Sequence, residues 1–240
     1  MLLNGWAGIG KVEFWVAVVK LIWINILLSG DNAMVIAMAC RGLPHRQRAW
    51  GMIFGAGVAV LLRIVFTGAV ASLMTLPYLK IAGGLALFYI AAKLLVPDDP
   101  DDGETGAAEH LWRAVRIVAV ADIIMSLDNV IAIAAAAGGN MALLVLGLAV
   151  SIPLIVGGAA LIMALLDRFP LLVWAGAALL GWIAGEVVAT DPVVTGYLVH
   201  AYGASVSQMV EYTFATVGAV LVLVGGGLWR RSKQTNASGV

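Results

Sequence analysis

The sequence predicts an all-α membrane protein in which seven transmembrane helices form two inverted three-helix repeats and a C-terminal helix. The first observation is composition: of 240 residues, 62% are hydrophobic and only 12% are charged, whereas a typical soluble domain is about half apolar and a quarter charged. The second is the recurrence of apolar stretches of about 20 residues, the length needed to span a bilayer. The third is a polar pattern that occurs twice inside these stretches, 97 residues apart.

The helices follow from the apolar stretches and from the turn residues between them. Proline, glycine and charged residues interrupt the hydrophobic runs, most clearly in the acidic linker 97–110, which no bilayer core would accept. We expect helices at residues 13–40, 50–73, 78–96, 111–137, 141–166, 171–189 and 212–229. The mixed stretch 191–211 has room for a short interfacial helix.

The whole chain, 1–240, is expected to form one transmembrane domain built around two copies of one unit. Repeat 1 covers about 13–96, repeat 2 covers 111–189, and the loop and seventh helix cover 190–229. Because three helices are an odd number, the second copy enters the membrane from the opposite side. Inverted repeats are common in secondary transporters, whose sites lie near the midplane between the repeats. The matching residues are Asn25, Asp31 and Asn32 in the first copy and Asp122, Asp128 and Asn129 in the second.

Basic residues in the short loops predict the orientation of the chain, because Lys and Arg accumulate on the cytoplasmic side. One side of the predicted bundle has only Lys11 and Lys80. The other side collects Arg41, Arg46, Arg48, Arg113, Arg116, Arg168, Arg230, Arg231 and Lys233. We therefore expect the N-terminus outside and the C-terminus in the cytoplasm. The first ten residues lack a basic region and a small-residue cleavage site, so no removable signal peptide is expected.

Composition and motifs exclude several classes of cofactor and partner. The formal net charge is zero, so bulk charge indicates no nucleic-acid partner. Cys40 is the one cysteine, which excludes an intramolecular disulfide and argues against a thiolate metal cluster. No G-x-x-x-x-G-K-[ST] motif is present, so ATP is not the expected energy source. The expected partners are the lipid bilayer and a metal ion, and the sequence is compatible with a homo-oligomer.

The polar residues inside the apolar stretches are the candidate site. A charge at the centre of a membrane helix costs about 2.5–3.5 kcal/mol on insertion scales, so such residues indicate function. Carboxylate, amide and hydroxyl oxygens are hard donors, suited to Mg, Ca or Mn. The predicted metal ligands are Asp31, Asn32, Asp122, Ser126, Asp128 and Asn129, and the assisting residues are Asn25, Ser29, Met125 and Arg63.

The polar arc suggests a broken helix in the first copy. At about 100° per residue, the polar side chains of each copy spread over roughly 160° of the helix surface. An interruption near Ser29 and Gly30 would bring Asp31 round to the others and free backbone carbonyls as ligands. Unwound backbone at membrane depth is tolerated where it lines a cavity.

Several of these residues have a second interpretation. The serine and asparagine side chains also suit a polar clamp that bonds helices together. Asp122 is either a third ligand or a proton carrier. Arg63 either neutralises an aspartate when no cation is bound or extends its charge to the membrane interface. Met125 either packs the bundle or favours Mn as a soft ligand.

The two Asp-Asn motifs resemble those of the TerC family of integral membrane proteins. The resemblance rests on Leu28-Ser-Gly-Asp-Asn-Ala33 with Arg41-Gly-Leu-Pro44, on Ala121-Asp-Ile-Ile-Met-Ser-Leu-Asp-Asn-Val130, and on Leu148-Ala-Val-Ser-Ile-Pro153. It covers about residues 13–190. It implies a compact seven-helix protein of the bacterial inner membrane within the LysE transporter superfamily, linked to manganese export and, by name, to tellurium resistance. It implies that the residues that matter most are Asp31, Asn32, Asp122, Asp128 and Asn129.

The leading functional hypothesis is a secondary transporter that exports a divalent cation, with Mn²⁺ the favoured ion, in exchange for protons. The cation is then cargo, and no prosthetic group is expected. The alternative is a non-transporting membrane partner in a metal-stress or tellurium-resistance complex. Paired aspartates can also serve as an acid/base pair in an enzyme, but no nucleophile or cofactor motif accompanies them, so an enzyme is not expected.

Overall fold

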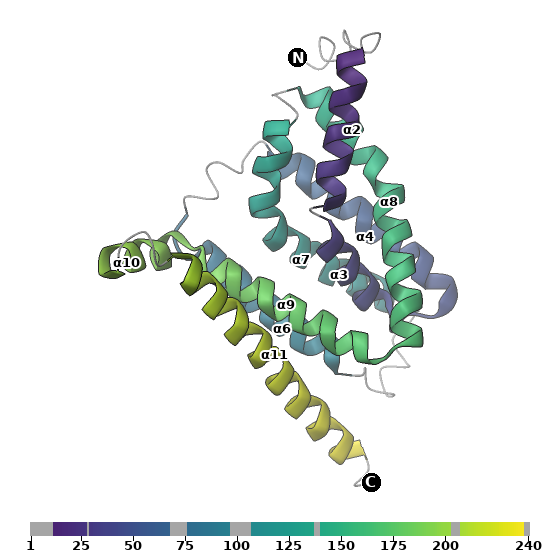
Figure 1. The fold of residues 1–240 in the computed structure, drawn as a ribbon. Coiled ribbons are helices and arrows are strands. Elements are labelled where there is room, and N and C mark those ends of the chain that lie inside the picture. The colour runs from purple at the N-terminus through teal and green to yellow at the C-terminus, as the bar shows by residue number, and fades with distance from the viewer. Residues whose placement is uncertain are drawn as a thin grey trace.

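The computed structural model of the protein describes residues 12–27, 29–67, 76–96, 107–136, 140–202 and 207–237. Within these ranges the side chains of 25–27, 67, 107–108, 127–132, 134–136, 141, 151, 199, 201–202, 207–208 and 234–237 are not described. The described part of the chain is all-helical (Figure 1). Its helices are α2 (Val12–Leu27), α3 (Gly30–Cys40), α4 (His45–Thr67), α6 (Leu79–Leu95), α7 (Ala107–Ala136), α8 (Met141–Arg168), α9 (Leu171–Ala189), α10 (Pro192–Tyr202) and α11 (Ser207–Ala237).

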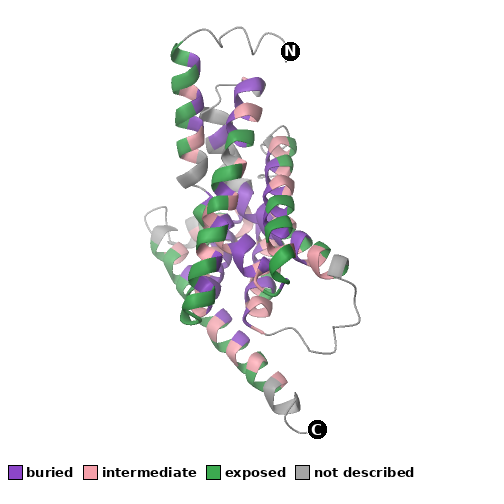
Figure 2. Ribbon diagram, turned by 90° about the vertical axis from the view of Figure 1, so that its right-hand side faces the viewer, coloured by how far each residue is buried: buried purple, intermediate pink, exposed green. Residues whose placement is uncertain are grey.

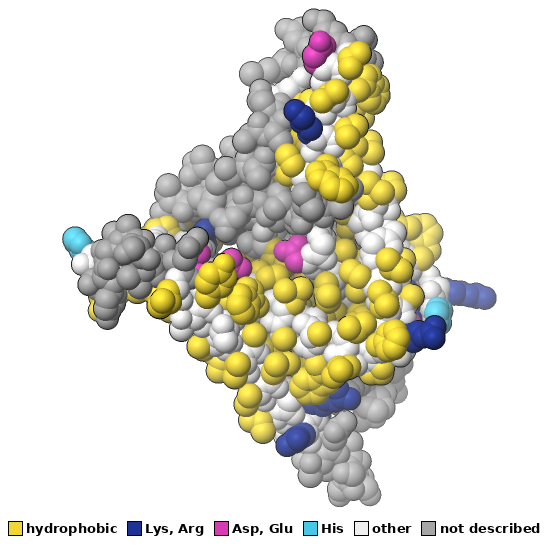
Figure 3. All heavy atoms as spheres, viewed as in Figure 1, with side chains coloured by type: hydrophobic (Ala, Val, Ile, Leu, Met, Phe, Trp, Pro, Cys, Tyr) yellow, Lys and Arg dark blue, Asp and Glu magenta, His cyan; other side chains and the backbone are white. Residues whose placement is uncertain are grey.

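Four of these helices have the length and hydropathy of a membrane span. They contain the segments His45–Phe66, Ala142–Arg168, Leu171–Ala189 and Met209–Lys233. Large apolar side chains are exposed on their outer faces, and hydrophobic side chains cover α8, α9 and α11 on the face shown in Figure 3. An apolar exterior over long helices is stable in lipid and not in water. The protein is therefore a multi-pass integral membrane protein, as the composition predicts.

The predicted helices agree closely with the observed ones. The prediction of 171–189 coincides with α9, and the predicted spans at 78–96 and 141–166 correspond to α6 and α8. The short helix expected within 191–211 is present as α10. The predicted helix 50–73 begins earlier, as α4, and its last residues lie outside the described part of the chain.

The first predicted span, 13–40, consists of two helices. Helix α2 ends at Leu27 and α3 begins at Gly30, with Ser29 as its N-cap residue at φ −116° and ψ 4°. Glycine is about 1 kcal/mol less favourable than alanine inside a helix, so a Ser-Gly pair is a plausible place for the chain to break. The interruption expected near Ser29 and Gly30 is thus confirmed.

The helices pack in two groups: α2, α3, α4, α7 and α8 form one, and α6, α9 and α11 form the other. The groups meet where α6 contacts α7 and where α9 contacts α3 and α8. Helix α9 lies against both α6 and α11, whereas α4 lies against α7 and α8, and α8 also lies against α2 and α3 (Figure 1). Helices α9 and α11 approach backbone to backbone: a Cβ atom added at Gly181 would lie 2.7 Å from the carbonyl oxygen of Gly218. Figure 2 shows the buried residues where the helices meet and the exposed residues on their outer faces.

A buried carboxylate joins the start of α6 to the end of α9. Asp191 accepts hydrogen bonds from the backbone N–H groups of Tyr78 (3.3 Å), Lys80 (3.2 Å) and Ile81 (3.3 Å). It also accepts one from Val193 (2.9 Å) in the first turn of α10. A carboxylate at a helix start satisfies N–H groups that have no partner within the helix and complements the helix dipole. Asp191 therefore anchors three helix ends in one place.

Candidate functional site

Arg63 of α4 is the centre of a buried polar network. Its side chain is 1% exposed. It donates from Nη2 to Asp122 Oδ1 (2.8 Å), from Nη1 to Ser29 Oγ (3.0 Å) and from Nε to Ser126 Oγ (3.1 Å). Of the two roles that the sequence leaves open for Arg63, neutralisation of an aspartate is the one observed. Its charge stays in the interior and does not extend to the membrane interface.

The local structure explains why these acceptors converge. Asp122 and Ser126 are four residues apart on α7, so they lie on the same face of that helix. Ser29 lies at the interruption between α2 and α3. Arg63 reaches both sites because α4 packs against α7 and contacts α3. A guanidinium carries five N–H donors in a fixed fork, so one arginine can bond to all three side chains.

The Arg63–Asp122 pair is almost fully removed from solvent, with side chains 1% and 2% exposed. Moving two charges out of water is costly, and an ion pair in the interior is stable only when further hydrogen bonds complete it. The two serines supply these bonds to the guanidinium. Asp122 Oδ2 is also buried, and it has no hydrogen-bond partner among the described residues. One oxygen of Asp122 thus holds Arg63, whereas the other makes no such bond to a described residue.

Asp31 and Asn32 lie in the first turn of α3, on the C-terminal side of the interruption between α2 and α3. Asp31 is half-buried, and its Oδ1 accepts a hydrogen bond from the backbone N–H of Asn32 (2.8 Å). Asn32 is buried. Asp31 is two residues from Ser29, whose hydroxyl accepts a hydrogen bond from Arg63, so the start of α3 lies close to the ion pair. A carboxylate at the positive end of a helix is favourable in itself.

The structure places only part of the predicted ligand set. Asp31, Asn32, Asp122 and Ser126 are gathered around the start of α3 and the middle of α7. The described residues include no group of three or more His, Cys, Asp and Glu side chains that could hold a metal ion. The side chains of Asn25, Asp128 and Asn129 lie outside the described residues, so their places in the site stay predictions.

Met125 is buried within the main hydrophobic core. This position agrees with the packing role that the sequence analysis weighed against a ligand role. What the sequence analysis missed is that Ser29 and Ser126 share Arg63 as their donor. The sequence indicates that the two serines are equivalent, because they are 97 residues apart, the same separation as Asp31 and Asp128, but it does not indicate their donor.

The fold and this site define a class of protein: a helical membrane protein with several spans and a buried ion pair beside further polar side chains. The chain belongs to the TerC family of integral membrane proteins, whose family model matches residues 10–234. The resemblance carried by the two Asp-Asn motifs is thereby confirmed.

Relatives of this chain occur in bacteria. It is 42% identical over 179 residues to the uncharacterized membrane protein YjbE of Bacillus subtilis (strain 168). The aligned region covers 75% of this chain and 82% of that protein. It is 26% identical over 188 residues to the uncharacterized membrane protein YkoY of the same organism, covering 70% and 58%. It is 26% identical over 221 residues to a UPF0053 protein of Haemophilus influenzae, covering 82% and 92%. No solved structure matches the chain significantly.

Proposed function

We propose that the protein is a secondary transporter that exports a divalent cation, with Mn²⁺ the favoured ion, in exchange for protons. The observation that carries the proposal is the state of Asp122. One carboxylate oxygen is fixed by Arg63, the other is buried without a hydrogen-bond partner among the described residues, and Asp31 is two residues from Ser29, which bonds to the same arginine. A carboxylate in a membrane interior is costly, and an oxygen left open beside a second carboxylate suits a hard cation.

In this proposal the cation binds between the two copies of the polar pattern. Asp31 and Asn32 supply oxygens from α3, and Asp122 Oδ2 and Ser126 supply them from α7. Asp128 and Asn129, one to two helical turns further along α7, complete the shell. Arg63 keeps its bond to Oδ1 and orients the carboxylate toward the ion.

The formal charges of these groups suggest a stoichiometry. The carboxylates of Asp31, Asp122 and Asp128 together with the guanidinium of Arg63 give the site a formal charge of −2. One divalent cation neutralises that charge, and so do two protons. Exchange of one divalent cation for two protons would keep the site neutral in both directions, which lowers the cost of holding it inside a bilayer.

The packing supports an inverted repeat. Leu21 and Val118 are 97 residues apart, both are buried, and each is contacted by a glycine from the second helix of the other copy. A Cβ atom at Gly55 of α4 would lie 3.4 Å from Val118, and one at Gly147 of α8 would overlap Leu21. The helix pairs α4–α7 and α8–α2 thus correspond.

A second pair of contacts joins corresponding helices, although the contacted residues are not at equivalent positions. Gly83 of α6 lies against Ile124 of α7, and Gly176 of α9 lies against Met34 and Met38 of α3. Repeat 1 would then comprise α2, α3, α4 and α6, and repeat 2 would comprise α7, α8 and α9. With α2 and α3 crossing together as one broken helix and α11 added, the bundle has seven spans.

We place the protein in the bacterial inner membrane, with the N-terminus outside and the C-terminus in the cytoplasm. The support is the charge asymmetry of the loops. Arg41, Arg48, Arg113 and Arg230, all assigned to the cytoplasmic side, line one shared cavity, which is what residues at one end of a bundle should do.

Metal flux in proteoliposomes tests this function. The full-length protein is reconstituted with a divalent-ion indicator inside the vesicles, and Mn²⁺ entry is measured with and without an imposed pH gradient. We expect flux in the wild type that is driven by the opposing proton gradient and is lost in Asp31→Asn and Asp122→Asn. The matched control is Glu109→Gln, which removes an exposed carboxylate from the same helix as Asp122 and should leave flux unchanged.

Two results would refute transport. Flux in the wild type no greater than in both aspartate variants, for every divalent ion tried, would exclude the site as a transport site. Wild-type protein that is folded and inactive toward all of these ions would favour the alternative, a non-transporting partner in a metal-stress or tellurium-resistance complex.

A further inference from the structure

The C-terminal end of α3 is held by Arg48, which lies in the first turn of α4. Arg48 donates from Nε to the carbonyl oxygen of Leu43 (3.0 Å) and from Nη2 to that of Arg41 (3.0 Å), the C-cap residue of α3. The last carbonyl groups of a helix have no partner within the helix, and a cation beside them complements the helix dipole. Arg48 therefore caps α3 and closes the turn that follows it.

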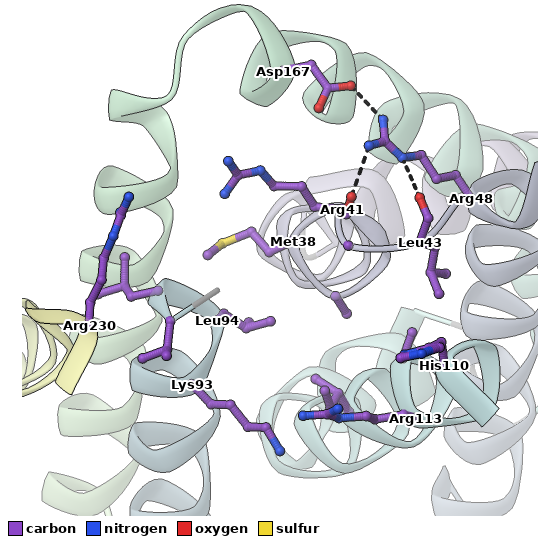
Figure 4. A pocket seen from close by; sticks show the side chains of 16 residues that line it. Met38, Arg41, Leu43, Arg48, Lys93, Leu94, His110, Arg113, Asp167 and Arg230 are labelled. Carbon is purple, nitrogen blue, oxygen red and sulfur yellow. Dashed lines mark hydrogen bonds and ion pairs between the residues drawn. The ribbon is translucent and has the colours of Figure 1, made fainter. Parts of the chain in front are cut away.

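The same guanidinium also reaches α8. Its Nη1 donates to Asp167 Oδ2 (2.7 Å) in the last turn of that helix (Figure 4). A carboxylate at the negative end of a helix is unfavourable by itself, and the cation offsets this cost. The fork of five N–H donors allows one arginine to bond to the carboxylate and to both carbonyl groups at once. The end of α3 is thus tied to the end of α8.

The two ends of α3 are held in the same way. At its start, Arg63 near the end of α4 bonds to Ser29, the N-cap residue, and to Asp122 of α7. At its end, Arg48 bonds to the backbone carbonyl groups and to Asp167 of α8. Each end of this 11-residue helix is therefore linked to one arginine of α4, and each arginine is linked to one aspartate further along the chain.

Helix α3 is a short, separate helix whose position determines part of the candidate cation site. The chain is interrupted before it, so α3 is not a rigid continuation of α2. Asp31 and Asn32 lie in its first turn, and 11 residues of helix are about 16 Å long, so a tilt at one end displaces the other. The C-terminal end borders a cavity of about 480 Å³, lined in part by Met38 and Arg41, which leaves room for such a tilt.

We propose that Arg48 and Asp167 are positioning residues for the cation site, because they fix the end of α3 and thereby the place of Asp31 and Asn32 at its start. This inference rests on the proposed function, and neither residue is a ligand of the cation. The two side chains are 18% and 43% exposed. Ion pairs of such exposure contribute little to stability, so loss of the bridge should alter the site without unfolding the protein.

Binding of Mn²⁺ to the full-length protein, measured by isothermal titration calorimetry in detergent, tests the proposal. Arg48→Gln and Asp167→Ala should each weaken binding roughly tenfold, the lower end of the effect of removing an outer partner of a metal site. Charge alone predicts opposite signs: loss of a positive charge should strengthen cation binding, and loss of a negative charge should weaken it. Weaker binding in both variants therefore reports the position of α3.

The matched controls are Arg46→Gln and Glu109→Ala. They remove one exposed charge of each sign from α4 and α7, and they should change affinity less than about twofold, since exposed charges at a distance are screened. Asp167→Asn keeps an acceptor oxygen for Arg48 and should recover most of the affinity lost in Asp167→Ala. If Arg48→Gln does not fold, Arg48→Lys replaces it, because an ammonium group keeps the charge but lacks the guanidinium fork.

Cys40, the one cysteine of the chain, reports the position of α3 without any metal. It is the last residue of α3, it is fully buried, and its Sγ lies against Gly51 of α4. Maleimide labelling of the folded protein should be slow in the wild type and several-fold faster in Arg48→Gln and Asp167→Ala, because a displaced helix end exposes the thiol. Both controls should be labelled as slowly as the wild type.

Three results would overturn the proposal, and they differ from one another. If the wild type binds Mn²⁺ and Arg48→Gln binds it as tightly or more tightly, Arg48 has no positioning role and the proposed function stands. Unchanged labelling of Cys40 in both test variants would show that the bridge does not hold the end of α3. If the wild type binds none of the divalent ions tried, the proposed function fails and the positioning role fails with it.

Discussion

The two copies of the polar pattern have the same spacing but different backbones. In the first copy the chain breaks between α2 and α3, and Ser29 is the N-cap residue of the new helix without a capping hydrogen bond from its side chain. In the second copy α7 continues without interruption from Ala107 to Ala136. The residue after the serine is glycine in the first copy and leucine in the second, and glycine is the weaker helix former. Equal spacing therefore does not give equal structure.

The copies also differ in charge, because neither member of the Arg63–Asp122 ion pair has a charged equivalent in the other copy. Asp122 of the second copy corresponds to Asn25 of the first. Its partner Arg63 corresponds to Pro153 in α8 when Gly57-Val-Ala-Val60 is aligned with Gly147-Leu-Ala-Val150. The buried ion pair thus occurs once, and neither of its charges occurs at the equivalent place. Because a buried charge without its partner is strongly destabilising, both members of such a pair have to be gained or lost together.

The largest effect is expected from breaking the ion pair on one side only. Arg63→Met leaves Asp122 buried without its counter-charge and should lower the free energy of unfolding by about 3–5 kcal/mol. The double variant Arg63→Met with Asp122→Leu removes both charges and should recover most of that loss. Thermal unfolding in detergent measures both. A double variant no more stable than Arg63→Met would show that the two charges do not act as a pair.

A smaller difference in stability is expected between alanine substitutions at Gly147 and Gly55, the glycines that contact the first helix of the other copy. Gly147→Ala forces a methyl group into Leu21, whereas the same change at Gly55 meets Val118 at an ordinary contact distance of 3.4 Å. Overpacking of this kind costs about 1–3 kcal/mol. We expect Gly147→Ala to lower the unfolding temperature and Gly55→Ala to leave it nearly unchanged. The reverse order would contradict the packing of α2 against α8.

The two serines should behave alike despite the different backbones around them. Ser29→Ala and Ser126→Ala each remove one hydrogen bond to Arg63. Such bonds between membrane helices contribute about 0.6–2 kcal/mol, so each variant should be destabilised by a similar amount in the same unfolding assay. A large effect at one serine and none at the other would show that Arg63 belongs to one copy only.

The smallest effect is expected at the interruption itself. A Cβ atom at Gly30 would meet no atom within 4 Å, so Gly30→Ala adds helix propensity without a clash. It should stabilise the protein by up to about 1 kcal/mol and reduce metal flux by favouring a continuous helix. Gly57→Ala is the control, since its Cβ atom also meets nothing and α4 is already continuous there. Unchanged flux in Gly30→Ala would mean that the interruption is not needed for transport.

The helices could be predicted from the sequence because they depend on local properties. Apolar runs of the right length, with turn residues between them, place α8 and α9 within a few residues. The break at Ser29 was also predictable, because the polar arc is combined there with a Ser-Gly pair, whereas α7 has the same arc with leucine after the serine and is continuous. The repeat spacing identified Ser29, Asp31, Asp122 and Ser126 as members of one site.

The partners of Arg63 could not be predicted in the same way. Its contacts depend on how α4 crosses α7 and α3, and this crossing is set by packing throughout the bundle. The basic cavity was missed for the same reason: charge asymmetry predicts which side Arg41, Arg113 and Arg230 share, but not that they face one another. Tertiary packing decides both.

The bonds of Asp191 have a mechanical consequence. Asp191 is two residues after the end of α9, and its two carboxylate oxygens bond to the beginning of α6 and to the beginning of α10. Sliding α6 along α9 would break three of these bonds at once, and the close glycine contacts between α9 and α11 resist sliding of α11 along α9. These contacts favour movement of α6, α9 and α11 as one unit in any large rearrangement of the bundle.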